Sequence, residues 1–308
     1  MPRGEKYLAL DLGAESGRAI LGVLDEGRLE LAEVHRFDNH PVATLGSLHW
    51  DVLRLWEEIN VGLARAAARY GSDLTAIGLD TWGVDFALLD RQGELLGLPY
   101  CYRDLRTEPI VADMRHLIPE MELYALTGLP YLKITTLCQL LAMRKGQSPA
   151  LDAASTLLMM PNLYTYWLCG VQVAESTIAG TSQLHELSSR NWCRSLVARL
   201  GLPGSLLPEI VPTATPLGEL LGPVAEAAGL SRIPVIAPAC HDTAAAIAAV
   251  PTQHGTATFI SSGTWSIIGT EVDAPVTTEE ALAAQFLNEI GPFGRLFLAH
   301  NSTGLWPL

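Results

Sequence analysis

The sequence predicts an α/β fold with two domains around a cleft, and three observations lead to this prediction. Short apolar runs of strand length alternate with helical patterns, which is typical of α/β architecture. The chain has 308 residues, and a single hydrophobic core rarely serves more than about 250–300 residues. A strand, a Gly/Ser turn and a second strand follow one another twice, at residues 7–24 and 257–270, which indicates an internal repeat.

The first domain is predicted to begin with strands. An apolar run at residues 7–10 stops at Asp11 and resumes at residues 19–24, which indicates two strands joined by a tight turn. Asp51 precedes a helical pattern that ends near Gly71, so a helix is expected between them. Further strands are predicted at residues 29–37, 76–79 and 86–89.

The remainder of the chain divides at a predicted hinge. Residues 109–230 show mostly helical patterns broken by proline and glycine, and they read as an elaboration of the first domain. A short strand at 234–238 leads into an alanine-rich helix at 244–250, which Pro251 ends. We therefore expect one domain at residues 1–243 and a second at residues 244–308.

Composition excludes several classes of function. The formal net charge is −13, and the 20 Lys and Arg residues are scattered along the chain, so no surface for nucleic acid is expected. The five cysteines are odd in number and contain no C-x-x-C pair, which argues against disulfides and zinc and favours the cytoplasm. No signal-peptide core and no segment of membrane-spanning length occurs, so no membrane partner is expected.

The first Gly/Ser turn, at residues 11–18, could bind phosphate. Small residues let the backbone approach a phosphate closely, and successive N–H groups can point at its oxygens. Arg18 could add positive charge, and Asp11 could orient the water shell of Mg²⁺. The alternative is a plain β-hairpin with an exposed Asp11. Neither the Walker A nor the Rossmann spacing of glycines is present.

The second turn, at residues 261–264, contains two serines, a glycine and Thr264. Its hydroxyl and amide groups could donate to phosphate from the opposite side of a cleft. Two such turns, each near the start of a predicted domain, favour a phosphate ligand more than one turn would.

The segment Cys240-His241-Asp242-Thr243 could supply a general base. Asp242 would accept a proton from an attacking hydroxyl during phosphoryl transfer. The alternative is that Asp242 only caps the following helix, as Asp often does. A Cys-His-Asp nucleophilic triad is excluded, because adjacent residues of one turn cannot adopt the relay geometry.

A third group of residues could bind a polyol. Asp80, Trp82 and Asp85 lie close in sequence, and Tyr102-Arg103-Asp104 follows. An aromatic face beside carboxylates and a guanidinium suits a sugar, which offers C–H faces and hydroxyls. The alternative is a core tryptophan with a surface Arg–Asp pair. The eight histidines show no metal-ligand spacing.

Taken together, these motifs resemble the FGGY carbohydrate kinases over essentially the whole chain, and within that family the branch that acts on L-rhamnulose. The resemblance implies an actin-like (ribonuclease H-like) ATPase fold and the transfer of phosphate from ATP, with Mg²⁺, to the 1-hydroxyl of L-rhamnulose in rhamnose catabolism. It implies Asp242 as the catalytic base. Expected substrate residues are Gly83, His241, Asp242 and Thr243, and expected nucleotide residues are Ala14, Glu15, Ser16, Gly17, Arg18, Thr264 and Asn301.

The sequence departs from the family pattern in two places. Cys240 stands where relatives often have serine, which should matter little beside the base. Family members also continue well beyond Leu308, so the nucleotide-binding second domain is expected to be partial and nucleotide binding to be impaired. Two alternatives to the rhamnulose kinase stay open: a kinase for another ketose such as fuculose or xylulose, or an inactive sugar-binding remnant.

Overall fold

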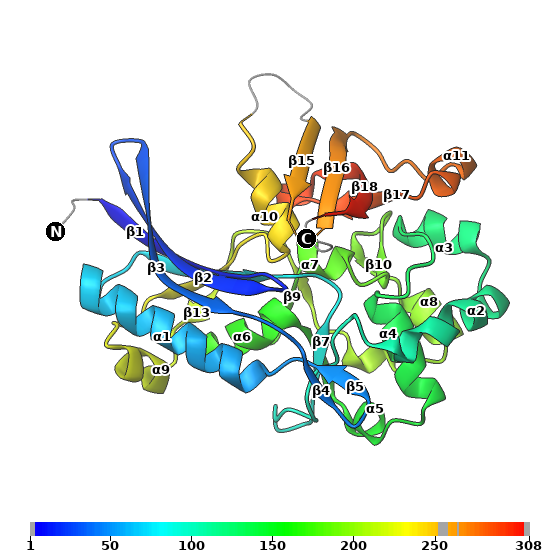
Figure 1. The fold of residues 1–308 in the computed structure, drawn as a ribbon, viewed down its shortest axis with the longest axis horizontal. Helices are drawn as coiled ribbons and strands as arrows, with labels where there is room; N and C mark the ends of the chain where they lie inside the picture. Colours follow the sequence, from blue (N-terminus) through cyan, green and yellow to red (C-terminus); the bar gives the residue numbers. More distant parts are fainter. Residues whose placement is uncertain (1–3, 252–257, 264, 305–308) are drawn as a thin grey trace.

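A computed structural model of the chain describes residues 4–251, 258–263 and 265–304. The polypeptide forms a large N-terminal region, with a six-stranded sheet and a helical layer beside it, and a smaller four-stranded sheet built from residues 258–303 (Figure 1).

The six-stranded sheet has the order β13-β14-β6-β1-β2-β3. Strands β1, β2 and β3 form an antiparallel meander, β6 pairs in parallel with both β1 and β14, and β13 closes the sheet antiparallel to β14. The bounds of these strands are β1 Glu5–Leu12, β2 Ser16–Asp25, β3 Arg28–Asp38, β6 Ala76–Thr81, β13 Thr215–Glu219 and β14 Pro234–Ala237.

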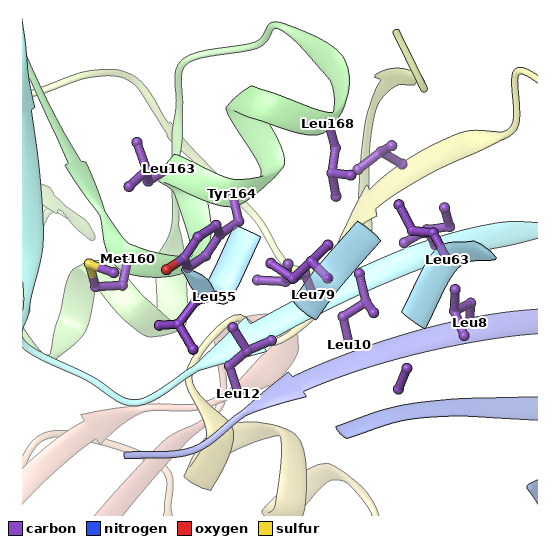
Figure 2. Packing of buried hydrophobic residues seen from close by; sticks show 14 of the residues in the cluster. Leu8, Leu10, Leu12, Leu55, Leu63, Leu79, Met160, Leu163, Tyr164 and Leu168 are labelled. Carbon is purple, nitrogen blue, oxygen red and sulfur yellow. The ribbon is translucent and has the colours of Figure 1, made fainter. Parts of the chain in front are cut away.

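One face of this sheet is buried under two helices, α1 (Val52–Tyr70) and α6 (Met160–Cys169). Leucines from alternate positions of β1 point toward leucines of α1 and apolar side chains of α6, as Figure 2 shows. Alternation with period two puts one set of side chains on this face and the other set on the opposite face. In β1 and β6 the opposite face carries Asp11 and Asp80.

The sequence explains why α1 begins and ends where it does. The side chain of Asp51 accepts a hydrogen bond from the Arg54 amide at the start of the helix, as expected of an N-cap. Gly71 follows the last turn with φ at 94° and donates its amide to the Ala67 carbonyl. The helix predicted between Asp51 and Gly71 is therefore confirmed.

The helical layer fills the middle of the chain and has its own buried core. Its helices include α2 and α4, which pack beside the antiparallel pair of β7 and β8. The remaining elements of residues 39–233 are β4 Val42–Thr44, β5 Ser47–His49, β7 Phe86–Leu89, η1 Leu105–Thr107, α2 Glu108–Leu117, α3 Glu120–Thr127, α4 Thr136–Lys145, α5 Pro149–Ala153, β8 Thr156–Met159, β9 Ala174–Glu175, α7 Ser176–Gly180, β10 His185–Glu186, β11 Asn191–Trp192, α8 Arg194–Arg199, η2 Gly204–Leu206, β12 Ile210–Val211 and α9 Gly222–Ala228.

The second sheet is antiparallel with the order β15-β16-β18-β17. Its core is small and consists of Ile247, Phe259, Ile267, Phe297 and Ala299. The elements of this region are α10 Asp242–Ala248, β15 Thr258–Ser262, β16 Trp265–Val272, α11 Glu279–Ala283, β17 Phe286–Ile290, η3 Pro292–Gly294 and β18 Leu296–Thr303.

Polar side chains attach the second sheet to the helical layer. The Tyr124 hydroxyl lies 3.1 Å from the carbonyl of Val276 and 2.9 Å from that of Phe286, so it can donate to either. The buried Asn288 side chain accepts from the Val276 amide and donates to its carbonyl, and the Asn288 amide donates to Gly128. The second sheet therefore rests on the first region through specific backbone contacts.

Most predicted elements are present. The strand, turn and strand at residues 7–24 is the β1–β2 hairpin, and β15 and β16 form a second hairpin. The helix predicted at 244–250 begins two residues earlier, at Asp242. The described part of the chain contains no helix that is both long and apolar enough to cross a membrane. The division between residues 243 and 244 stays a prediction.

Candidate functional site

The β1–β2 turn is a tight loop held by its neighbours. The Gly13 amide donates to the Ser16 carbonyl, while Asn39 binds the turn from outside through its side chain to Gly13 and its amide to Glu15. A β-carbon added at Gly17 would lie 2.2 Å from the Phe37 ring, so a larger residue there would require that ring to move. Two consecutive amides of the turn, those of Ala14 and Glu15, have no acceptor within the described ranges.

Arg18 lies beside this turn and pairs with Asp11. The guanidinium donates to the Asp11 carboxylate, and the two residues face one another in the antiparallel register of β1 and β2. Both side chains are partly exposed, 41% for Arg18 and 26% for Asp11. The residue predicted to bind phosphate, Arg18, therefore lies next to the residue predicted to orient the water shell of Mg²⁺, Asp11.

Three carboxylates, those of Asp11, Asp80 and Asp242, gather at the carboxyl-terminal ends of the central strands β1 and β6. Asp11 and Asp80 are direct partners in the parallel pairing of β1 and β6. The next residue, Thr81, bridges to His241 and donates its amide to the Cys240 carbonyl, which brings Asp242 to the same strand ends. Burial raises the pKa of Asp80 well above its ordinary value, and the charges of Asp11 and Asp242 raise it further.

Asp242 is a carboxyl with a raised pKa. Burial raises its pKa to about 7, and the charge of Asp11 adds to this, while hydrogen bonds from Thr243 oppose it. The Thr243 amide donates to Asp242 Oδ1 at 2.6 Å. A base works best when its pKa lies near the working pH. The capping alternative is wrong, because the N-cap position is His241 and Asp242 is the first residue of α10.

The backbone that leads to Asp242 is anchored by Glu175. This fully buried carboxylate accepts the Cys240 amide at 3.1 Å and the Thr213 hydroxyl at 2.6 Å. It also accepts the amide and hydroxyl of Thr177, and the Thr177 hydroxyl oxygen in turn accepts the His241 amide. Sequence reasoning missed Glu175, because no spacing rule links it to a loop 65 residues away.

His241 lies between Asp242 and the second sheet. Its Nε2 lies 3.5 Å from Asp242 Oδ1, and its Nδ1 lies 3.9 Å from Glu289 Oε2 on β17. Burial lowers the pKa of His241 and raises that of Glu289, which favours the neutral imidazole. Glu289 was also missed, and nothing in its sequence neighbourhood signals that it faces His241.

Trp82 belongs to the core, so the alternative of a core tryptophan is confirmed and the sugar-stacking role is wrong. Its side chain is only 3% exposed, packs against Trp50 at a centroid distance of 4.2 Å, and donates to the Asp85 carboxylate at 3.0 Å. The ring belongs to the core and offers no face on which a sugar could stack. Burial raises the pKa of Asp85 to about 6 against the hydrogen bonds from Trp50, Gln139 and Trp82. Gly83 follows on the partly exposed side of this turn.

Residues 102–104 make two kinds of contact, one with the β1–β2 turn and one within the core. Arg103 Nη2 lies 3.8 Å from Glu15 Oε1, which links this segment to the β1–β2 turn. Asp104 is 5% exposed and accepts the amides of Leu48 and Arg106. The surface Arg–Asp pair considered as an alternative is therefore wrong, because Asp104 is a buried structural carboxylate.

Of the two nucleotide residues predicted near the end of the chain, Asn301 is described by the structure and belongs to the second sheet. Asn301 on β18 pairs in register with Ile267 on β16, and its Oδ1 atom is buried with no hydrogen-bond partner in the part of the chain described. Thr264 lies outside the described residues. Within those same ranges, no group of three or more His, Cys, Asp and Glu residues is arranged to hold a metal ion directly.

Comparison with known proteins identifies the family. The profile described as the FGGY family of carbohydrate kinases, N-terminal domain, matches residues 6–248. The chain belongs to the FGGY family of carbohydrate kinases. It is 41% identical over 304 residues to a rhamnulokinase from Bacteroides thetaiotaomicron and 38% identical over 299 residues to one from Oceanobacillus iheyensis. These alignments cover 99% and 97% of the chain but 62% and 63% of the relatives.

Solved structures of the family confirm the predicted actin-like α/β fold. A carbohydrate kinase from Novosphingobium aromaticivorans superimposes with a TM-score of 0.83 at 26% identity, covering 98% of this chain and 64% of that one. A gluconate kinase from Lactobacillus acidophilus gives a TM-score of 0.85 at 16% identity, covering 96% and 59%. The FGGY chain described here thus spans about three fifths of the length of the relatives and structures that it matches.

Proposed function

We propose that this chain carries the sugar site and the catalytic base of an ATP-dependent kinase that phosphorylates L-rhamnulose at its 1-hydroxyl. The observation that carries the proposal is Asp242, a carboxyl with a pKa of about 7 at the junction of the two regions. The similarity of the chain to rhamnulokinases supports the choice of L-rhamnulose as the sugar.

In the proposed reaction Asp242 orients the 1-hydroxyl and accepts its proton as the oxygen attacks the γ-phosphorus of ATP. A bond forms between that oxygen and phosphorus, and the bond from phosphorus to the leaving ADP oxygen breaks. Most of the acceleration comes from positioning and charge stabilisation. Gly83, His241 and Thr243 are proposed to bind the sugar, since all three lie beside Asp242 or on the turn that follows β6.

The β1–β2 turn is proposed to hold the phosphates of ATP through residues 14–18. The unpartnered amides of Ala14 and Glu15 and the guanidinium of Arg18 supply donors of the required kind. Thr264 and Asn301 are proposed to contact the nucleotide from the second region.

We propose that Asp11 holds a magnesium ion through water, since its carboxylate is partly exposed beside Arg18 and Mg²⁺ keeps several waters and takes few carboxylates. A bound Mg²⁺ would neutralise charge on the phosphates, and this chain's part is to aim the Asp11 carboxylate at its water shell.

The remaining assignments follow from this proposal. We place the boundary between the sugar-binding and nucleotide-binding parts at residues 243 and 244. We also propose a cytoplasmic location, which the free thiols support: all five cysteines are unpaired. Partners other than the ketose and ATP are not part of the proposal.

The test is Asp242→Asn in a coupled assay of ADP release with L-rhamnulose, with calorimetry for sugar binding. Loss of the base should lower kcat by about 10²–10⁴-fold while ketose affinity changes little. Wild-type-like ADP release by Asp242→Asn contradicts the base assignment. A panel with fuculose and xylulose decides which ketose is preferred, and sugar binding by the wild type without any ADP formation indicates a binding protein.

A further inference from the structure

The turn at residues 83–85 has a strained backbone. Val84 has a φ of 69°, and the Asp85 amide donates to the Gly83 carbonyl at 2.9 Å, which closes a three-residue γ-turn around Val84. A γ-turn with positive φ at its centre is rare and strained, and a β-branched residue there is an outlier. Among the described non-glycine residues with positive φ, Val84 alone is β-branched.

Strain of this kind persists only where the surroundings hold it in place. The Val84 carbonyl accepts the Thr136 hydroxyl at 2.7 Å. The carboxylate of the next residue, Asp85, accepts four hydrogen bonds. The donors are the indole N–H groups of Trp50 and Trp82, the Tyr102 amide and the Gln139 side-chain amide. These bonds fix the carbonyl side of Val84 and the residue that follows it.

Thr181 fixes the other side. The Val84 amide donates to Thr181 Oγ1 at 3.0 Å, and the Thr181 hydroxyl donates to the Ile178 carbonyl at 2.8 Å. Because its proton is used toward Ile178, the oxygen of Thr181 is free to accept from Val84. The two residues are 97 positions apart in sequence, and this is the sole acceptor of the Val84 amide within the described ranges.

The turn leaves one donor at Gly83 without a partner. Neither a backbone nor a side-chain acceptor within residues 4–251, 258–263 and 265–304 takes the Gly83 amide. A β-carbon at position 83 would lie 3.0 Å from Thr181 Cγ2, so Thr181 also packs directly against this glycine. Gly83 is two residues beyond Thr81, whose amide binds the Cys240 carbonyl just before the base.

We infer that Thr181 is a positioning residue for the ketose: its hydroxyl holds the strained turn at Val84 so that the Gly83 amide is presented to a hydroxyl or carbonyl oxygen of the sugar. The inference rests on the proposed function and adds to it a residue that makes no contact with the substrate itself. Removing the Thr181 hydroxyl lets the turn relax and moves the Gly83 donor.

The experiment uses the full chain and four variants, with the dissociation constant for L-rhamnulose measured by calorimetry. Thr181→Val keeps the side-chain shape but leaves the partly buried Val84 amide without its acceptor, so binding should weaken by about tenfold or more. Thr181→Ser keeps the hydroxyl and should bind within about threefold of the wild type, because the bond to Val84 is retained. Val84→Gly, alone and with Thr181→Val, tests the strain.

Glycine adopts positive φ without a side-chain penalty, so Val84→Gly in the Thr181→Val background should restore most of the lost affinity. A purely structural role would lower the free energy of unfolding without this pattern of loss and rescue, and urea denaturation of each variant provides that comparison. Exchange of the Val84 amide with solvent should be faster in Thr181→Val than in Thr181→Ser without any ligand.

The outcomes separate this inference from the proposed function. If the wild type binds L-rhamnulose and Thr181→Val binds it equally well, the positioning role is overturned and the proposed function stands. Weakening in Thr181→Val that Val84→Gly does not restore overturns the role of strain. If the wild type binds no ketose at all, the proposed function fails, and the positioning role fails with it.

Discussion

The two regions of the molecule differ in how they are stabilised. The N-terminal region buries two large apolar clusters, one between the six-stranded sheet and its helices and one within the helical layer. The second sheet buries a single small cluster of five residues and relies on Tyr124, Asn288 and a few apolar contacts to dock on the first region. A small core stabilises a fold less than a large one, so the second sheet depends on its neighbour.

The candidate site lies where these two regions meet. Asp242 opens the helix that leads into the second sheet, and Glu289 of β17 faces His241 beside it. Asp242 is therefore anchored by the region with the larger cores through Glu175 and Cys240, while the neighbouring His241 faces Glu289 of the region with the small core. Opening of the second sheet should alter the surroundings of the base before it alters the sugar side.

The largest expected contrast is in amide hydrogen exchange. Amides of β1 and β6 should exchange only on global unfolding, whereas those of β15 and β16 should exchange through opening of the second sheet alone. We expect a difference in protection on the order of 10³ between Leu79 and Ile267. Exchange followed by mass spectrometry checks this, and equal protection in the two sheets would show a single cooperative unit.

The next largest contrast is expected from truncating one core side chain in each region. Leu79→Ala, at a fully buried position of β6, should lower the free energy of global unfolding by about 2–5 kcal/mol. Ile267→Ala should lower only the free energy for opening the second sheet. Leu105→Ala, at a residue 69% exposed, is the control and should change stability by less than about 0.5 kcal/mol. Loss of global stability in Ile267→Ala equal to that in Leu79→Ala would refute the contrast.

The docking contact offers a smaller effect. Tyr124→Phe removes the hydroxyl that binds the carbonyls of Val276 and Phe286, and should make opening of β17 and β18 easier by about 1–2 kcal/mol. Tyr131→Phe removes a comparable hydroxyl that donates to Ile118 within the first region and serves as the matched control. Exchange of β17 and β18 amides reports the difference, and an equal response to both variants would argue against Tyr124 as a docking residue.

The smallest effect concerns pH. Because the folded-state pKa of Asp242 is raised to about 7 from 3.8, the folded protein binds this proton more tightly than the unfolded chain. Its contribution to stability is full below about pH 4 and is lost as the pH rises through 7. The side chain is 34% exposed, so solvent screens the effect.

Asp242→Asn should therefore be more stable than the wild type at pH 8 by about 1 kcal/mol, with the gain disappearing near pH 4. Urea denaturation at the two pH values measures this. A variant that is less stable than the wild type at pH 8 would show that the Asp242 carboxylate stabilises the fold.

Local patterns were enough to predict much of the fold. The β1–β2 hairpin is encoded by apolar runs on either side of a Gly/Ser turn, and α1 by an Asp51 cap and a Gly71 stop. Asp242 was predicted from its place before a helix and from family resemblance, and the structure adds the neighbours that raise its pKa.

The supporting residues could not be predicted, because their partners are distant in sequence. Glu175 binds the Cys240 amide and Thr181 binds the Val84 amide, over separations of 65 and 97 residues. The sequence left two interpretations of Trp82 open for a different reason. An indole next to carboxylates has the same sequence pattern in a sugar site and in a core, and only burial distinguishes them.

The most direct test of the account is product formation by the wild-type chain with Mg²⁺, ATP and L-rhamnulose, followed by ³¹P NMR. The account predicts a new phosphomonoester signal from phosphate on the 1-hydroxyl, formed faster than with fuculose or xylulose and abolished in Asp242→Asn. No phosphomonoester with any ketose, or an equal rate in Asp242→Asn, would contradict it.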